Sequence, residues 1–278
     1  MASGYAIGID CGSTLCKGVL LGPQGNHAPK GEAPKVPFHI EAFSVLPTGW
    51  DLQESASRVV AELKGIAAGL IGNAEPVSNT VTDIPIIATG YGREKVRERI
   101  RAVTEISAHA RGACSLMPGV RTVIDIGGQD CKVIAVENGR AVSFQMNDKC
   151  AAGTGRFVQM ILERFKADIP LMDELLAAGK SIRLNSTCAV FAESEIIGLL
   201  AKGHSREEII GGVALSLAVK IGSLAARTGL CAPVVLTGGL SESTGIRRAL
   251  SETLKVEVLH LRQGLYAGAI GAACTAPG

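Results

Sequence analysis

A short phrase occurs twice in this chain, and the repeat constrains the fold more than any other feature. The first copy, IDCGSTLCK, runs from Ile9 to Lys17, and the second, IDIGGQDCK, runs from Ile124 to Lys132. Aligned without a gap, the Ile, Asp, Gly, Cys and Lys residues coincide, and apolar strand-like residues flank both copies. Such self-similarity indicates two related units. We therefore expect two phosphate-binding turns that face each other across a cleft.

Each turn carries the groups that an anion-binding loop needs. Gly12 lets the backbone approach an anion closely, and Ser13 and Thr14 offer hydroxyl and amide donors. A lysine at the start of the next strand can add a positive point charge. The residues expected to contact the phosphates are Gly12, Ser13, Thr14, Lys17, Gly127, Gly128 and Lys132.

The aspartates of the two turns suggest a divalent cation. Asp10 and Asp125 would repel a phosphate directly, but they suit a Mg²⁺ ion whose water shell lies between carboxylate and phosphate. Gln129 or Asp130 could orient a water for hydrolysis. The alternative is that each copy is a plain hairpin with a glycine turn. The presence of two copies favours phosphate binding, and the absence of a G-x-x-x-x-G-K-[ST] motif excludes a P-loop protein.

Strands alternate with helices along the chain, which predicts an α/β architecture. Strands are expected at 5–10, 17–21, 85–90 and 234–239, and another strand, turn and strand begin at Thr122. Helices are expected at 52–71, 93–102, 205–228, 246–254 and 266–273, and two more follow Cys150 and Cys188. A Pro118-Gly119 break predicts lobes at 1–117 and 118–278, with the option that the last helix packs back on the first lobe.

Composition narrows the class of protein. Apolar residues make up 47% and charged residues 19%, which provides ample material for cores. Lys plus Arg (28) nearly balances Asp plus Glu (26), so no nucleic-acid footprint is expected. The longest apolar stretch, Ile209–Val219, is too short to span a bilayer. No secretory signal is visible, so the eight cysteines suggest a cytoplasmic protein with thiols or metal ligands.

The repeat and the Thr237-Gly238-Gly239-Leu240 turn resemble those of the acetate kinase, sugar kinase, heat-shock 70-kDa protein and actin superfamily. The resemblance implies a duplicated ribonuclease-H-like fold, in which ATP binds in the cleft between two lobes. It also implies that Gly238 and Gly239 contact the adenosine side of the nucleotide.

Two cysteines each precede a predicted helix. A helix N-terminus favours the thiolate of Cys150 or Cys188, which is the form that binds a metal. A four-iron cluster generally needs four thiolates, and a two-fold dimer would supply the other two. The alternative is that both are small buried hydrophobic residues. Packing explains Cys16 and Cys131 at equivalent strand starts, and Cys11, Cys114, Cys231 and Cys274 have no evident partner.

Four segments resemble one specific family. NDKCAAGTGRF and CAVFAESE look like the two cysteine signatures of the 2-hydroxyacyl-CoA dehydratase activators, also called the benzoyl-CoA reductase type (BadF/BadG/BcrA/BcrD) ATPases. The resemblance implies that Cys150 and Cys188 bind one 4Fe-4S cluster shared by a homodimer. The matching segments are 125–132, 147–157, 188–195 and 266–273. Cys16 and Cys131 depart from the expected Thr or Ser, and Leu240-Ser241-Glu242-Ser243 departs from the expected Val-Ala-x-Asn.

The family resemblance implies an ATP-dependent one-electron donor of anaerobic metabolism. A reduced ferredoxin or flavodoxin would load the cluster, and hydrolysis of ATP would drive the electron to a dehydratase. A benzoyl-CoA reductase or a related iron–sulfur reductase is the alternative acceptor. Rivals from other classes are a small-molecule kinase with Asp130 or Glu193 as base, and a nucleotide-driven binding module. His109 could line the cleft or be a structural residue.

Overall fold

The computed structural model describes residues 4–23, 38–72, 84–148, 153–184 and 189–277. The chain forms two compact units. The first unit comprises the residues up to Pro118 together with those from Tyr266 onward, and the second comprises Gly119–Leu265. The last helix therefore belongs to the first unit, although it follows the second unit in the sequence.

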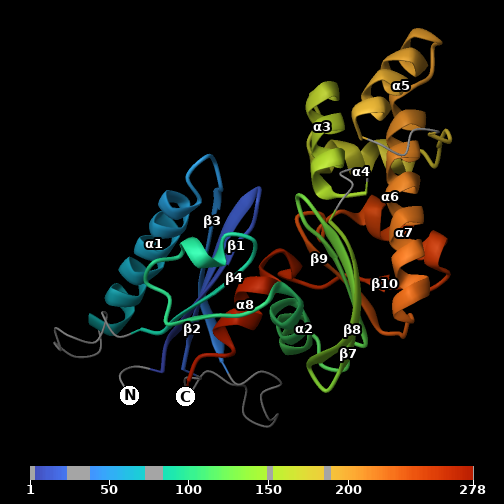
Figure 1. The fold of residues 1–278 in the computed structure, drawn as a ribbon. Coiled ribbons are helices and arrows are strands. Elements are labelled where there is room, and N and C mark those ends of the chain that lie inside the picture. Colours follow the sequence, from blue (N-terminus) through green and yellow to red (C-terminus); the bar gives the residue numbers. More distant parts are fainter. Residues whose placement is uncertain (1–3, 24–37, 73–83, 149–152, 185–188, 278) are drawn as a thin grey trace. The chain divides into compact units, whose positions relative to one another are not determined.

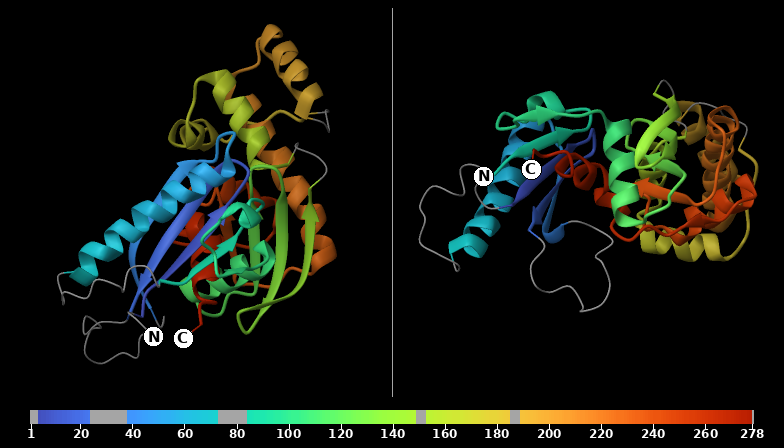
Figure 2. Two further views of the ribbon diagram at one scale, coloured as in Figure 1. Left: turned by 60° about the vertical axis from the view of Figure 1, so that its left-hand side comes forward. Right: turned by 90° about the horizontal axis from the view of Figure 1, so that it is seen from below.

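The first unit is built on a five-stranded mixed sheet in the order β3-β2-β1-β4-β5. Strands β1, β2 and β3 pair antiparallel, whereas β4 and β5 continue from β1 in parallel. Figures 1 and 2 show helix α1 along one face of this sheet, with α8 on the other face and α2 beside α8. The elements are β1 (Ala6–Cys11), β2 (Leu15–Gly22), β3 (His39–Pro47), α1 (Leu52–Gly72), β4 (Ile86–Thr89), β5 (Arg101–Ala102), α2 (Glu105–Leu116) and α8 (Ala267–Ala273).

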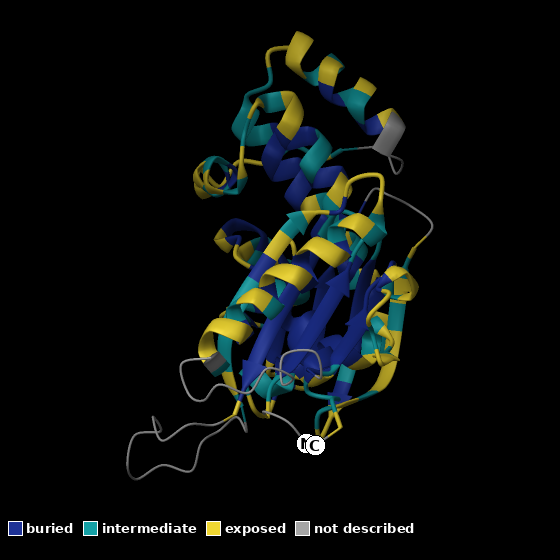
Figure 3. Cartoon of the chain, turned by 90° about the vertical axis from the view of Figure 1, so that its left-hand side faces the viewer, coloured by how far each residue is buried: buried dark blue, intermediate teal, exposed yellow. Residues whose placement is uncertain are grey.

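Amphipathic patterning places α1 on the sheet. Its buried side chains recur at helical spacing and pack on the apolar residues of β1, β2 and β4. Strands β1, β2 and β4 are buried, and Figure 3 shows the outward face of α1 exposed. On the other face, Gly112 of α2 and Gly271 of α8 allow close backbone approach. A Cβ on either glycine would overlap a carbonyl oxygen of the opposite helix, that of Ala267 or Ala108.

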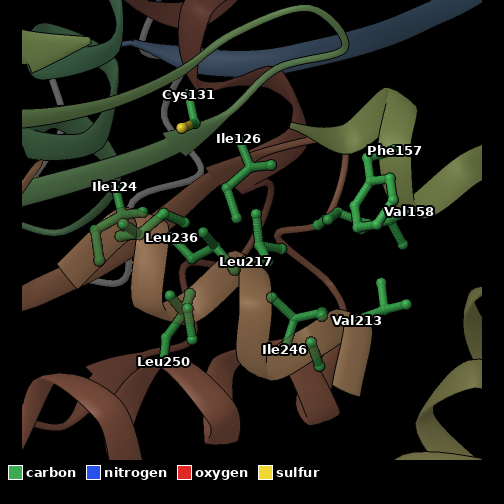
Figure 4. Close-up of a cluster of buried hydrophobic side chains, with 14 of the residues drawn as sticks. Ile124, Ile126, Cys131, Phe157, Val158, Val213, Leu217, Leu236, Ile246 and Leu250 are labelled. Carbon is green, nitrogen blue, oxygen red and sulfur yellow. The ribbon is translucent and has the colours of Figure 1, made fainter. Parts of the chain in front are cut away.

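The second unit repeats the same sheet plan. Its strand order is β10-β9-β6-β7-β8, with β6, β7 and β8 antiparallel and β9 and β10 parallel to β6. Its strands are β6 (Thr122–Ile126), β7 (Cys131–Glu137), β8 (Arg140–Asn147), β9 (Val234–Gly238) and β10 (Val258–Leu259). Its helices are α3 (Gly155–Phe165), α4 (Ile169–Ala177), α5 (Ala189–Ala201), α6 (Arg206–Thr228) and α7 (Thr244–Leu254). Figure 4 shows strand and helix side chains meeting in one apolar cluster.

Helix α6 confirms the helix predicted at 205–228. Ser205 and Glu208 form the expected capping box at its start, and it ends at Thr228. By length and composition α6 could cross a bilayer, so the expectation that no segment is long enough was wrong. However, 61% of its most apolar window is buried inside the structure, as in a core helix.

Several predicted elements are confirmed and one is wrong. The strands around both turns, the strand at Ile86–Thr89 and helix α1 form as expected. The expected helix 93–102 is instead a short 3-10 turn at Arg93–Lys95 followed by β5. The amides of Ile100 and Val103 donate to the carbonyls of Ile86 and Ala88, so pairing with β4 overrides the local helical pattern. Strand β3 and helix α4 were not predicted.

Candidate functional site

The first turn joins β1 to β2. The amide of Gly12 donates to the carbonyl of Leu15 at 3.0 Å and closes the turn. Thr48, just after β3, fixes the turn from outside, because its hydroxyl donates to the carbonyl of Gly12 at 2.8 Å and its amide to that of Thr14 at 2.9 Å. Gly12, Ser13 and Thr14 are half-buried. Since the Gly12 amide is used inside the turn, Ser13 and Thr14 are the expected phosphate donors.

The second turn has the same backbone plan and a different outside support. The amide of Gly127 donates to the carbonyl of Asp130 at 2.9 Å. The first residues of α3 then donate back to the turn, from Gly155 to the carbonyl of Gly127 at 2.8 Å and from Arg156 to that of Gly128 at 3.0 Å. The second turn is therefore hydrogen-bonded to the helix that follows the Cys150 signature.

A buried carboxylate and a buried ammonium group face each other beside each turn. Strand pairing places Asp10 opposite Lys17, and the Lys17 Nζ lies 2.7 Å from an Asp10 oxygen. It also places Asp125 opposite Lys132, whose Nζ lies 3.3 Å from Asp125 and 2.6 Å from Asp130. Both lysines were expected to face phosphate. In this structure their charges offset those of the carboxylates, because a buried charge requires a partner.

The two residues proposed to orient a water differ in their surroundings. The Asp130 carboxylate is held by Lys132, as described above. A Cβ on Gly127 would lie 2.6 Å from an Asp130 oxygen, so that glycine is needed for the carboxylate to fold over the turn. Gln129 is exposed at the tip of the turn. Of the two, Gln129 is the side chain that can reach a water without breaking an ion pair.

A threonine–glycine pair on the neighbouring parallel strand completes each turn. Thr89 of β4 is the register partner of Asp10, and Thr237 of β9 is that of Asp125. The following residues, Gly90 and Gly238, have φ near +90° (92° and 89°). A Cβ on Gly90 would lie 2.7 Å from Asp10 Oδ1, and one on Gly238 would lie 2.9 Å from Asp125 Oδ1. Only glycine suits this position.

The sequence reasoning identified Gly238 but missed Thr89 and Gly90 as its equivalents. Each pair is a Thr-Gly after a buried apolar strand, which is the signal that could have revealed them. The hydroxyl of Thr237 donates to Asp125 Oδ1 at 3.0 Å. The hydroxyl of Thr89 is buried and has no hydrogen-bond partner among the described residues.

His109 and the last helix also border the first carboxylate. A Cβ on Gly268 of α8 would lie 2.8 Å from Asp10 Oδ2 and 2.9 Å from His109 Nε2. Both side chains are buried, and both lie against this glycine. The structure thus places His109 next to the Asp10 carboxylate within the first unit.

The expected adenosine turn is a tight backbone feature of the second unit. The Gly239 amide donates to the carbonyl of Ile126, and the Ser241 amide to that of Gly238. Asp173 of α4 then caps α7, because its carboxylate accepts from the Thr244 and Gly245 amides at 2.8 and 3.0 Å. Nothing within 4 Å would meet a Cβ on Gly239, so that residue borders open space.

The predicted cluster ligands, Cys150 and Cys188, lie outside the described residues. The helices that follow them are described, with α3 beginning at Gly155 and α5 at Ala189. Among the residues that the structure describes, no group of three or more His, Cys, Asp or Glu side chains could hold a metal ion. Burial raises the pKa of the Cys131 thiol to about 11, which keeps it protonated and suits a packing role.

The carboxylate beside each turn, Asp10 in the first unit and Asp125 in the second, is a hard oxygen ligand of the kind that holds Mg²⁺ through its waters. In the first unit, the buried Thr89 hydroxyl lacks a hydrogen-bond partner within the described part of the chain.

Comparison with known proteins places these features in a family. The BadF/BadG/BcrA/BcrD ATPase family model matches residues 7–276. The (R)-2-hydroxyglutaryl-CoA dehydratase activating ATPase of Acidaminococcus fermentans is 37% identical over 279 residues, which cover 97% of this chain and 95% of that protein. The solved structure of component A of the (R)-2-hydroxyglutaryl-CoA dehydratase from the same organism has a TM-score of 0.82 at 39% identity, covering 99% of this chain and 98% of that one.

A second solved relative carries a nucleotide analogue. The activator of the 2-hydroxyisocaproyl-CoA dehydratase from Clostridium difficile, with bound ADPNP, has a TM-score of 0.81 at 35% identity and covers 97% of this chain and 92% of that one. These likenesses confirm the expected α/β fold.

Proposed function

The chain belongs to the BadF/BadG/BcrA/BcrD ATPase family, and on that premise we propose that it hydrolyses ATP to drive one-electron transfer to a 2-hydroxyacyl-CoA dehydratase. Relatives along nearly the whole chain are a dehydratase-activating ATPase and a dehydratase activator with bound ADPNP. The proposal therefore assigns this chain the same class of acceptor enzyme.

The observation that carries the proposal is the hydrogen bonding between the second turn and α3. Gly127 and Gly128 belong to the turn expected to hold phosphate, and the amides of Gly155 and Arg156 donate to their carbonyls. A shift of the turn on loss of the γ-phosphate would therefore move the N-terminus of α3, which follows Cys150 in the sequence. Nucleotide state and redox site are thus coupled through two backbone hydrogen bonds.

The proposed roles of the turn residues follow from their chemistry. Ser13 and Thr14 donate to the phosphates, and Gln129 orients the attacking water. Asp10 and Asp125 hold the hydrated Mg²⁺, which neutralises charge on the phosphates. Gly238 and Gly239 let the backbone approach the adenosine. The ion pairs of Lys17 and Lys132 keep both carboxylates oriented until the nucleotide binds.

The redox part of the proposal rests on the two cysteine signatures. Cys150 and Cys188 are the proposed ligands of one 4Fe-4S cluster per homodimer, and a cluster bound there stores the single electron that is transferred. A reduced ferredoxin or flavodoxin is the proposed donor. ATP can favour the electron-donating state only if it binds that state more tightly than the resting state.

Gly155→Ala tests the coupling. A Cβ at this position would lie 2.9 Å from the Gly127 carbonyl and would push α3 away from the turn. We expect hydrolysis of ATP within about twofold of wild type but a loss of about tenfold in ATP-dependent reduction of the dehydratase, since about one to two hydrogen bonds transmit the shift. Gly198→Ala, in α5, is the matched control because nothing lies within 4 Å of its Cβ.

The iron and sulfide content of the anaerobically purified protein distinguishes an electron donor from a kinase. Anaerobically purified protein should contain four irons and four sulfides per dimer and show an electron paramagnetic resonance signal after reduction by dithionite. A colourless protein that cannot be reconstituted and phosphorylates a small molecule would be a kinase. Transfer of electrons to a benzoyl-CoA reductase but to no dehydratase would change the acceptor and leave the coupling intact.

A further inference from the structure

Two cysteines face each other directly beside the first turn. Cys11, the last residue of β1, is paired in register with Cys16 of β2. The next pair, Gly12 and Leu15, is hydrogen-bonded through the Gly12 amide at 3.0 Å. Because hydrogen-bonded and non-hydrogen-bonded pairs alternate along an antiparallel ladder, Cys11 and Cys16 form a non-hydrogen-bonded pair, in which the Cα atoms are about 4.5 Å apart.

This separation lies within the range that a disulfide spans. Disulfides join cysteines whose Cα atoms are about 4.4 to 6.8 Å apart, and directly opposite side chains share one face of the sheet. Here both thiols are free, fully buried, and hydrogen-bonded to each other. The Cys11 thiol also lies 3.8 Å from the carbonyl of Leu52 at the start of α1. The two sulfurs are therefore already neighbours in the reduced protein.

The second unit lacks this arrangement at the equivalent place. There the register partner of Cys131 is Ile126, so the thiol faces an alkyl side chain. Packing alone is satisfied by an Ile–Cys pair, as this unit shows. The thiol pair of the first unit is therefore not required by the shared hairpin.

We propose that Cys11 and Cys16 are a redox modification site, which a peroxide converts into a reversible cross-strand disulfide beside the first turn. One thiol reacts with hydrogen peroxide to give a sulfenic acid and one water. The second thiol attacks the sulfenic sulfur, forms the S–S bond and releases a second water. The two cysteines lose two electrons and two protons in total, and the peroxide is reduced to two waters.

The position of the pair gives a small oxidant a route. Gly12, Ser13, Thr14 and Leu15 are only half-buried, and the cysteine pair is the second pair from the turn, directly after Gly12 and Leu15. Local opening of these two pairs at the end of the hairpin needs less free energy than global unfolding. Such opening also breaks the contact of the Cys11 thiol with the carbonyl of Leu52 at the start of α1.

The disulfide would cross-link the two strands that carry the first turn and restrict how the turn adjusts to a ligand. The expected consequence is weaker binding of ATP, which is a statement that rests on the proposed function, whereas formation of the disulfide does not. We expect affinity for Mg·ATP to fall about tenfold, which corresponds to the loss of about one charge-assisted hydrogen bond. A reductant should restore it.

Peptide mapping of the whole protein tests the disulfide directly. Anaerobic protein is treated with hydrogen peroxide, unfolded in an alkylating agent and digested with trypsin. No Lys or Arg precedes Lys17, so both cysteines lie in the same peptide. We expect that peptide to lose two hydrogens and take no alkyl group, and to take two alkyl groups after reduction. The peptide 122–132, with Cys131 as its single thiol, is the internal control.

Variants link the modification to its effect. Cys16→Ala and Cys11→Ile, which copies the pair of the second unit, should abolish the peroxide effect on ATP affinity, and Cys131→Ala should preserve it. Recovery of Cys11 and Cys16 as separately alkylated or over-oxidised residues in the wild type would overturn the proposal. If the disulfide forms but ATP affinity is unchanged, the modification stands and the nucleotide role of the first turn is wrong.

Discussion

The two turns share one scaffold and differ in what they support with it. In both, an aspartate faces a lysine across the hairpin, and a Thr-Gly pair on the adjacent parallel strand lies against that aspartate. In both, the first glycine amide closes the turn. The shared features are backbone hydrogen bonds and buried charge pairs, so they hold the turns in shape whatever residues stand at the tips.

The differences lie at the tips and in the outside supports. The first turn carries two hydroxyls, Ser13 and Thr14, and is supported by Thr48. The second carries Gln129 and Asp130 and is supported by the N-terminus of α3. The two turns thus share their backbone scaffold and differ in the side chains at their tips. We infer that the first turn binds the nucleotide and the second senses and hydrolyses it.

The largest expected effect is a difference in ATP hydrolysis between variants of the two aspartates, Asp125 and Asp10. Asp125→Asn should lower kcat for ATP hydrolysis about a thousandfold, about 4 kcal/mol in barrier height, because this carboxylate is the proposed Mg²⁺ ligand beside the turn that carries Gln129. Asp10→Asn should instead raise KM for Mg·ATP and lower kcat by less than about tenfold. Steady-state kinetics over a range of Mg·ATP concentrations checks both. Equal kcat losses in the two variants would contradict separate roles of the first turn in binding and of the second turn in hydrolysis.

The lysines of the two turns should differ in how much each contributes to the free energy of unfolding. Lys132→Met removes an ammonium group that pairs with two carboxylates and should lower the free energy of unfolding by about 3 to 4 kcal/mol, whereas Lys17→Met removes one that pairs with a single carboxylate and should lower it by about 1 kcal/mol less. Urea denaturation followed by circular dichroism measures both. Adding Asp130→Ala to Lys132→Met should restore part of the loss. A Lys17→Met variant less stable than Lys132→Met would contradict this account.

The scaffold could be predicted from the sequence where the repeat is local. Asp, Gly and Lys coincide without a gap, so the two strand–turn–strand hairpins and their equivalence followed from the sequence alone. The Thr-Gly pairs contact the turns from strands far along the chain, and the segments between turn and strand differ in length in the two copies. Thr89 was therefore placed on a strand but not in the site.

Side-chain partners were the least predictable part. Residue type suggested that Lys17 and Lys132 face phosphate, but burial makes each ammonium group pair with a carboxylate. The hydrogen bonds from α3 to the second turn join backbone groups, which no residue type specifies. The expected helix at 93–102 failed for the same reason, because the β4 edge offers backbone acceptors that a local pattern does not reveal.

The smallest expected effects concern Thr89 and Thr237. They test whether the hydroxyl of each threonine has its hydrogen-bond partner before nucleotide binds. Thr237→Val removes a hydroxyl that donates to Asp125 and should lower the free energy of unfolding by about 1 to 2 kcal/mol. Thr89→Val removes a buried hydroxyl that has no partner among the described residues and so carries an unrepaid desolvation cost, and it should therefore raise the free energy of unfolding of the nucleotide-free protein by about 1 kcal/mol.

Binding of nucleotide should give the Thr89 hydroxyl a stabilising role. If this hydroxyl binds a water of the Mg²⁺ shell, Thr89→Val should reduce the thermal stabilisation that Mg·ATP gives to the wild type, and Thr237→Val should reduce it less. Thermal melts with and without Mg·ATP, at the same protein concentration, measure that difference. A Thr89→Val protein stabilised as much as the wild type would show that the hydroxyl is a packing residue. The first turn would then bind phosphate without help from β4, unlike the second, where Thr237 orients Asp125 from β9.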